Sequence, residues 1–203
     1  DLTDAKTFGT SSIMLGDATT GTISAANYNT GVGVDVFEDL TSGDNNSAFG
    51  FFALGNNTSG GNNTMVGAYA GALNIDDADN TAVGYAANYP DGGSNVTAVG
   101  SVALNANTAS DNTAVGKGAL TATVGGANNT AVGSLAGVAN VSGSEGTFVG
   151  YRAGRTVTTG NQSTVIGSFT LDNGAACTGT NNTAVGHGSL RIATSGHSNV
   201  CVG

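Results

Sequence analysis

The hexapeptide Asn128-Asn129-Thr130-Ala131-Val132-Gly133 decides the fold, because it recurs unchanged as Asn181-Asn182-Thr183-Ala184-Val185-Gly186. Shorter copies such as Asn112-Thr113-Ala114-Val115-Gly116 occur along the whole chain. The last glycine of each copy falls at positions 16, 33, 50, 67, 84, 100, 116, 133, 150, 167, 186 and 203, a mean spacing of 17 residues. Self-similarity at a fixed short period indicates a repeat architecture. We therefore assign residues 12–203 to one repeat domain and residues 1–11 to an N-terminal joining segment.

Each copy has the pattern of a short strand. The residue before the glycine is apolar, and the residue two places earlier is usually threonine, which is the period-two spacing of β-branched residues typical of strands. No segment sustains the apolar spacing of a helix. A unit of 17 residues with one strand has the size of one coil of a solenoid, whose coils stack through parallel ladders ~4.8 Å apart. We predict an all-β parallel β-solenoid or β-roll of about twelve coils, about 58 Å long.

Stacked coils place equivalent residues in columns, and two columns have expected roles. The apolar half of each coil is confined to the strand and to pairs such as Ala119-Leu120, so we expect the apolar stripe to be buried against identical chains, preferably as a homotrimer. This assembly core comprises Val66, Val83, Val99, Val115, Val132, Val149, Ile166 and Val185. Stacked amides are a known device of β structures. The expected amide ladder comprises Asn63, Asn80, Asn112, Asn129 and Asn182.

Composition excludes several classes of protein. The chain has 34 glycines in 203 residues but one proline, which excludes collagen. A hydrophobic content of 39% excludes a disordered tail. The longest nearly apolar stretch, 65–73, is too short to span a bilayer, so we expect no membrane insertion. A net charge of -9 with only five Lys and Arg predicts no binding to nucleic acid.

Metal and cofactor chemistry finds no support in the sequence. The spacing of His187, His197, Cys177 and Cys201 matches no zinc pattern. The acidic run Asp76-Asp77-Ala78-Asp79 lacks the spacing of a calcium loop, and we interpret it as a solvated turn. A disulfide between the two cysteines stays open at this point, although Cys201 occupies a column that elsewhere holds alanine. We expect no metal and no cofactor.

Catalytic patterns are also missing, since no Ser/His/Asp arrangement or carboxylate pair stands out. We therefore expect a non-enzymatic protein. The aromatic residues allow two interpretations: they fill the ends and corners of coils, or exposed tyrosines stack on sugar rings. The residues concerned are Phe49, Phe51, Phe52, Tyr69, Tyr85, Tyr89 and Tyr151.

The repeat resembles two known groups. Ser12-Ile13-Met14-Leu15-Gly16 and Asn199-Val200-Cys201-Val202-Gly203 are similar to the Ser-Val-Ala-Ile-Gly head repeat of trimeric autotransporter adhesins. The commoner Asn-Thr-Ala-Val-Gly unit also resembles repeats of bacteriophage tail fibres. The resemblance implies a trimeric, left-handed parallel β-roll whose two β-branched columns face inward. The period here is longer than the adhesin's, and threonine replaces valine in most copies.

These features together predict a structural fibre or tail fibre-like virion appendage with a host-adhesion role, at the virion surface or the bacterial cell surface. The alternative is a bacterial surface adhesin head of the trimeric autotransporter type. More distant alternatives are a polysaccharide depolymerase and an ice-binding solenoid, whose threonine ladder would comprise Thr64, Thr81, Thr97, Thr113 and Thr130. The suggested partners are identical chains, axially stacked fibre subunits, and a cell-surface glycan or host receptor.

Overall fold

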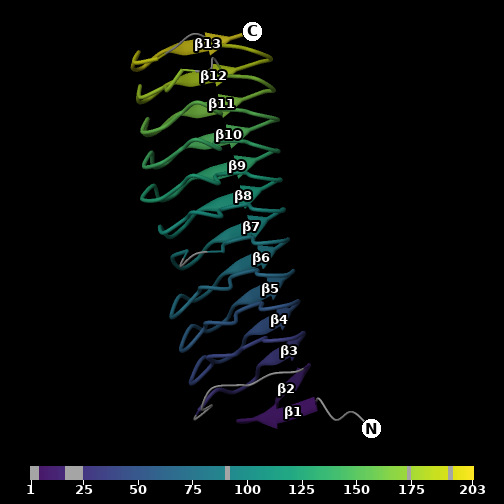
Figure 1. Cartoon of the computed structure of the whole chain (residues 1–203). Coiled ribbons are helices and arrows are strands. Elements are labelled where there is room, and N and C mark those ends of the chain that lie inside the picture. The colour runs from purple at the N-terminus through teal and green to yellow at the C-terminus, as the bar shows by residue number, and fades with distance from the viewer. Residues whose placement is uncertain (1–4, 17–24, 90–91, 173–174, 192–193) are drawn as a thin grey trace.

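The computed structural model describes residues 5–16, 25–89, 92–172, 175–191 and 194–203. These residues form one sheet of 13 strands that follow one another in sequence order (Figure 1). The described part of the chain contains no helix. The predicted all-β solenoid is thus confirmed, and the first and the last strand lie at opposite ends of the rod.

The strands are short. They are β1 Ala5–Phe8, β2 Ser12–Leu15, β3 Thr30–Val32, β4 Ser47–Phe49, β5 Thr64–Val66, β6 Thr81–Val83, β7 Thr97–Val99, β8 Thr113–Val115, β9 Thr130–Val132, β10 Thr147–Val149, β11 Thr164–Ile166, β12 Thr183–Val185 and β13 Val200–Val202.

Strands β2 to β13 pair in parallel with no shift of register. In β7 and β8, for example, Thr97 lies opposite Thr113 and Val99 opposite Val115. The same register holds where a coil has 19 residues, since Ile166 of β11 lies opposite Val185 of β12. Extra residues are therefore accommodated in the turns. Strand β1 lies antiparallel to β2, so the described part of the N-terminal segment extends the sheet by one strand.

The interior of each coil is lined by the middle residue of its strand. Ala98 and Ala131 are fully buried, whereas Val132 beside Ala131 is 40% exposed. Alternate side chains of a strand point to opposite faces, so a buried middle residue forces its two neighbours outward. The Ala-Leu pair after the turn, such as Ala119-Leu120, closes the interior from the other side and is also fully buried. One chain therefore encloses a core of its own.

Large residues in this narrow core are matched by glycines. Phe148 takes the place of alanine in the middle of β10 and is fully buried. The glycine at position 154 takes the place of the leucine, and a Cβ there would lie 2.2 Å from the Phe148 ring. A Cβ on Gly71 would similarly lie 2.8 Å from the Met65 side chain. Protein interiors are close-packed, so volume added in one column has to be removed from the next.

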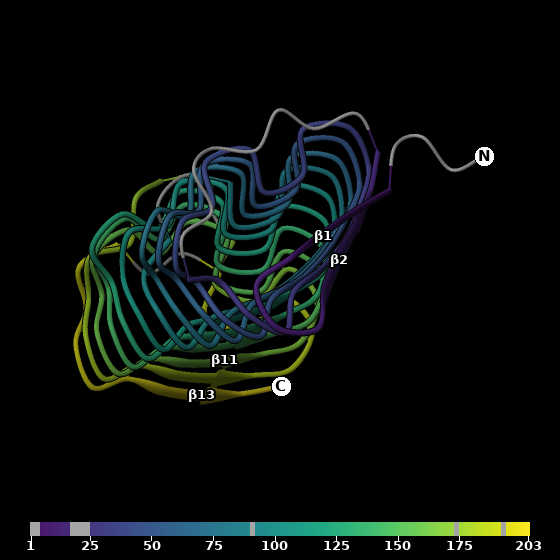
Figure 2. The same ribbon diagram turned by 90° about the horizontal axis from the view of Figure 1, so that it is seen from below.

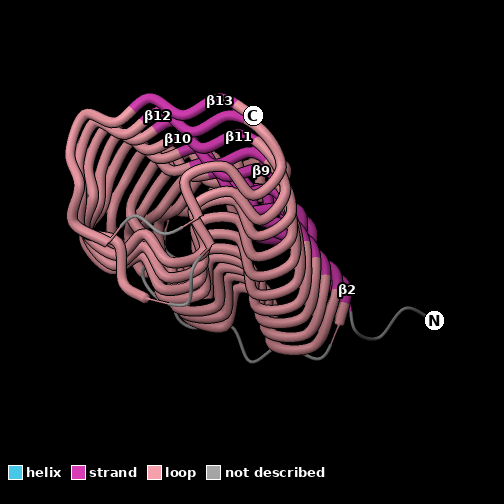
Figure 3. The backbone as a smooth tube through the Cα atoms, turned by 90° about the horizontal axis from the view of Figure 1, so that it is seen from above, coloured by secondary structure: helices cyan, strands magenta, loops and turns pink. Residues whose placement is uncertain are grey.

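The repeating glycine ends each strand because two constraints meet there. Gly116 has a φ of +134°, which side-chain-bearing residues rarely adopt. A Cβ at this position would also lie 2.5 Å from the carbonyl group of Gly133 in the next coil. The coil then bends further through residues with left-handed backbone conformations, which after Gly116 include Gly118 and Leu120. Seen along the rod, the strands occupy one side and turns make the remaining outline, which is indented away from the strands (Figures 2 and 3).

Candidate functional site

The outer face of the sheet is the first candidate surface. We call the first and last residue of each strand from β3 to β13, mostly threonine and valine, together with Ile13 and Leu15 of β2, the Thr-Val face. The predicted assembly core lies on it: Val66, Val83, Val132 and Ile166 are 37–40% exposed, and Val99, Val115, Val149 and Val185 are half-buried. The resemblance implied that both β-branched columns face inward. In the single chain this orientation is wrong, because the middle residues fill the interior and turn both columns outward.

The predicted ladder asparagines lie buried at the position before each strand. The Asn129 amide nitrogen Nδ2 donates to the Gly143 carbonyl at 2.8 Å, and its Oδ1 accepts from the Gly146 backbone N–H at 2.8 Å. Its own backbone N–H donates to Oδ1 of Asn112 at 2.9 Å. Each amide thus joins its coil to the next one, and it satisfies buried backbone groups that turns leave unpaired. Asn63, Asn112 and Asn182 bond in the same way.

The ladder is interrupted where the repeat changes. Val96 stands at the asparagine position of the coil after Asn80. The Val96 backbone N–H still donates to Asn80 Oδ1 at 2.9 Å. The Asn80 Nδ2 group is buried and has no hydrogen-bond partner among the described residues. Gly146 and Ser163 interrupt the asparagine column further along the chain.

The acidic run bonds between coils. Asp77 accepts hydrogen bonds from the Gly93 backbone N–H at 3.0 Å and from the Ser94 hydroxyl at 3.2 Å. Asp79 accepts from the Asn62 amide at 3.0 Å. Among the described residues, no three His, Cys, Asp or Glu side chains gather where they could hold a metal ion.

The histidines and cysteines are separated in the structure. The His187 ring packs on Phe169 with centroids 5.9 Å apart, and His197 Nδ1 lies 2.9 Å from the Thr180 hydroxyl. Both cysteines are free thiols. Cys177 is buried beside Val157. Cys201 is half-buried in the strand position that holds alanine elsewhere.

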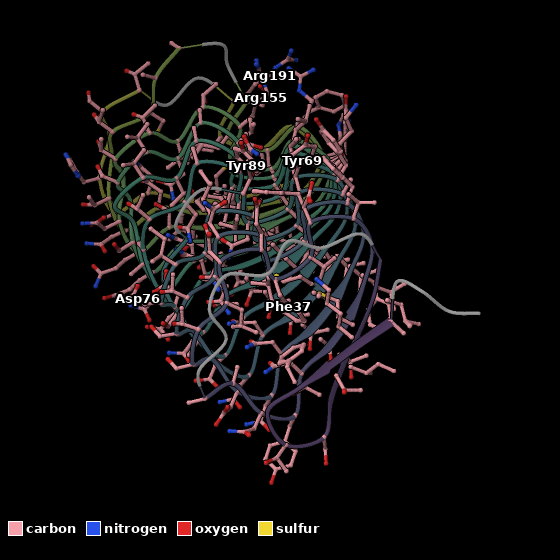
Figure 4. All side chains as sticks on the ribbon, turned by 60° about the horizontal axis from the view of Figure 1, so that its bottom comes forward. Phe37, Tyr69, Asp76, Tyr89, Arg155 and Arg191 are labelled. Atoms are coloured by element: carbon pink, nitrogen blue, oxygen red, sulfur yellow. The ribbon has the colours of Figure 1, made fainter. Side chains whose placement is uncertain are left out.

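The second candidate surface is the aromatic edge, which we define as the first, second and fifth positions after each repeating glycine. Tyr69 lies at the centre of its larger aromatic cluster. The Tyr69 ring makes edge-to-face contacts with Phe51, Tyr85 and Tyr89, with centroids 5.1, 6.2 and 6.1 Å apart. Such pairs stabilise fixed ring orientations. Figure 4 shows Tyr69 and Tyr89 toward the same edge of the solenoid as Arg155 and Arg191.

A groove of about 470 Å³ opens beside this cluster. Its lining comprises Tyr69, Tyr85, Ala86, Tyr89, Val102 and Asn105. The Asn105 Nδ2 group donates to the Ala86 carbonyl at 3.1 Å, which fixes the amide at the groove wall. The tyrosines are evident in the sequence, but the groove beside them was not predicted. The positions of the tyrosines could have indicated it, because residues that lie the same number of positions after successive repeating glycines stack on one another.

The aromatic edge carries a second, basic cluster nearer the C-terminus. Arg152 and Arg155 both form ion pairs with the Asp172 carboxylate, which is 2% exposed, and the Arg152 pair measures 3.0 Å. The Arg152 guanidinium also lies 5.1 Å from the centre of the Phe169 ring. Arg155, Asp172 and Arg191 each lie five residues after a repeating glycine. Sequence reasoning missed this cluster, although that equal spacing places opposite charges in adjacent coils.

The fold defines this chain as a single-sheet parallel β-solenoid. No family model, curated protein or solved structure matches it. The described residues include no helix long and apolar enough to cross a membrane.

Proposed function

We propose that this chain is a non-enzymatic structural subunit of an extracellular fibre or virion appendage, assembled as a homotrimer with a host-adhesion role. The observation that carries the proposal is the Thr-Val face. It runs without a change of register from β2 to β13, and the apolar residue that ends each of these strands is exposed or half-buried on it. Soluble monomers rarely expose contiguous apolar patches larger than a few hundred Å².

A second copy of the chain is the partner that fits this face best. Its strand residues carry no charge, whereas the whole chain has a net charge of -9, so identical chains repel one another least there. A strip about 58 Å long and about 10 Å wide offers about 600 Å², close to the ~800 Å² per partner of a stable interface. Closed rotational symmetry would bury the strip of every copy at one axis.

The extracellular location is proposed from surface chemistry and from the resemblance to fibre repeats. The chain is rich in Asn, Thr and Gly and has only five Lys and Arg. A rigid rod with regular columns suits a spacer that holds an adhesive surface away from a particle or cell. A bacterial adhesin head of the trimeric autotransporter type is the alternative location for the same rod.

The oligomeric mass tests the proposal. We expect wild-type chain at micromolar concentration to show about three times 19.6 kDa by light scattering after gel filtration. Val132→Asp places a charge in the centre of the Thr-Val face, and desolvating it should reduce the mass to one chain. Circular dichroism should still show strands, because the chain has its own core.

The matched control is Ser134→Asp, which adds the same charge two residues away, on the aromatic edge. It should leave the trimer intact. A wild-type monomer, or a Val132→Asp variant with the wild-type mass, would refute the shared core.

An ice-binding solenoid is the second candidate, and one observation favours it. The five threonines of the expected ladder lie in register on the Thr-Val face, in strands β5 to β9. This candidate needs the face to be open in solution. A monomeric chain that produces thermal hysteresis, lost in Thr113→Tyr, would favour it over the fibre.

A further inference from the structure

The groove beside Tyr69 stands out because the solenoid does not need it. Stacking is maintained by the interior columns and the asparagine ladder, and the coils that follow Gly100, Gly116 and Gly133 have no aromatic residue on the aromatic edge. The first position after the repeating glycine is Ser101, Lys117 and Ser134 in three successive coils, where the preceding coil has Tyr85. Tyr85 is 56% exposed, so its ring is not filling the core. Three of the chain's five tyrosines meet at this one groove.

The rings are also held in place before any ligand binds. Tyr69 contacts the rings of Phe51, Tyr85 and Tyr89, and the interplanar angles of these pairs are 85°, 84° and 76°. The groove wall thus presents rings in different orientations, borne by two adjacent coils. Rigid aromatic side chains give large contact areas at a low cost in conformational entropy.

The chemistry of the lining selects the ligand class. Among the described residues that line the groove, three phenol hydroxyls and the Asn105 amide are the polar side-chain groups, and none of these residues is acidic or basic. Rings beside hydroxyls and an amide suit a molecule with apolar C–H faces and hydroxyl edges, which describes a sugar ring. Since the chain has a net charge of -9, an anionic sugar would be repelled at long range.

We propose that this groove is a binding site for neutral glycans, with pyranose rings stacked on Tyr85 and Tyr89 and their hydroxyls bonded by the phenols and Asn105. Tyr85 and Tyr89 belong to one coil and Asn105 to the next, ~4.8 Å further along the rod, so a sugar stacked on these rings would lie within reach of the amide. The proposal deepens the adhesion role above and rests on it for the cell-surface source of the glycan. A volume of about 470 Å³ falls within the usual ~300–1,000 Å³ of ligand sites.

The test uses tyrosine fluorescence, because the chain contains no tryptophan. The probes are neutral hexasaccharides of glucose, galactose and mannose, with oligogalacturonate as the anionic comparison. We expect saturable quenching by at least one neutral probe. Tyr85→Ala should weaken its affinity at least tenfold, and Tyr85→Phe should retain affinity within about threefold because the stacking ring remains.

Tyr28→Ala is the control, since Tyr28 is 57% exposed and does not line the groove. It should leave the affinity unchanged. The proposal is overturned if none of the neutral probes saturates, if only oligogalacturonate binds, or if affinity survives in both Tyr85→Ala and Tyr89→Ala. Light scattering on the same samples separates the two proposals: a monomer that binds the glycan refutes the fibre alone, and a trimer that binds none refutes the groove alone.

Discussion

The Thr-Val face and the aromatic edge are built by the same coils but follow different rules. On the face, threonine and valine recur strand after strand in one register. On the edge, the first position after the repeating glycine changes from Tyr85 to Lys117 to Tyr151. A strand residue of the face lies opposite the same residue type in the next coil, so its position keeps that type along the rod. A position on the edge holds different residue types in successive coils. The comparison supports the two proposals, which place assembly on the repetitive surface and ligand binding on the variable one.

The largest effect should follow from Gly116→Ala, which breaks the repetitive part. The new Cβ would require strain at a φ of +134° and would lie 2.5 Å from the Gly133 carbonyl group. We expect a loss of about 3 kcal/mol or more in the free energy of unfolding. A urea titration followed by circular dichroism measures it.

Lys117→Ala is the matched control, because Lys117 is the exposed neighbour on the aromatic edge. It should change the unfolding free energy by less than about 0.5 kcal/mol. Equal losses in both variants would contradict the distinction between the repetitive and the variable surface.

A smaller effect is expected for Asp172→Asn, which tests whether the variable edge also stabilises the solenoid. The substitution leaves Arg152 and Arg155 without their shared buried carboxylate. Both guanidinium groups are about one third exposed, so water compensates part of the loss, and we expect a cost of about 1–3 kcal/mol. The same urea titration measures this cost, and it should shrink in high salt. A stability equal to that of wild type would show that the basic cluster is not structural.

The smallest difference should separate Asn63→Ala from Asn80→Ala. Asn63 uses both side-chain atoms, bonding the Asp77 carbonyl and the Asn80 N–H at 2.9 and 3.0 Å. Asn80 uses only its oxygen, because no described residue accepts a hydrogen bond from its Nδ2 group. Asn63→Ala should therefore cost about 1 kcal/mol more. The midpoints of urea-induced unfolding of the two variants measure this difference. A lower midpoint for Asn80→Ala than for Asn63→Ala would contradict the role of the interrupted ladder.

Most of the fold could be predicted from the sequence. The glycine spacing gives the coil length, and Thr113-Ala114-Val115 gives the strand and its parallel register with the next copy. The sequence did not show which of these side chains faces inward. Valine is the more hydrophobic residue, so burial alone favours Val115. The structure buries Ala114 instead, since the interior must also hold Ala119 and Leu120.

The candidate sites could be predicted less well. Tyr69 and Tyr85 are recognisable as neighbours in adjacent coils from their distances to the repeating glycines. Whether they leave a groove depends on Ala86 and Val102 beside them, because larger residues would fill the space. Whether these side chains leave an open space depends on their positions in the folded chain, which the sequence does not give. The expectation of a partner for the Thr-Val face stays a prediction, since the structure contains one chain.

The parallel register also determines how this rod responds to force. Its ladder hydrogen bonds run along the rod, and β1 and β13 lie at opposite ends of it (Figure 1). Tension applied between the ends therefore loads the bonds of the outermost coil first. When that coil opens, its 17 residues extend and lengthen the tether by about 50 Å. A single chain under tension would therefore unfold one coil at a time, with nearly equal increases in length. Each step would dissipate part of the mechanical energy.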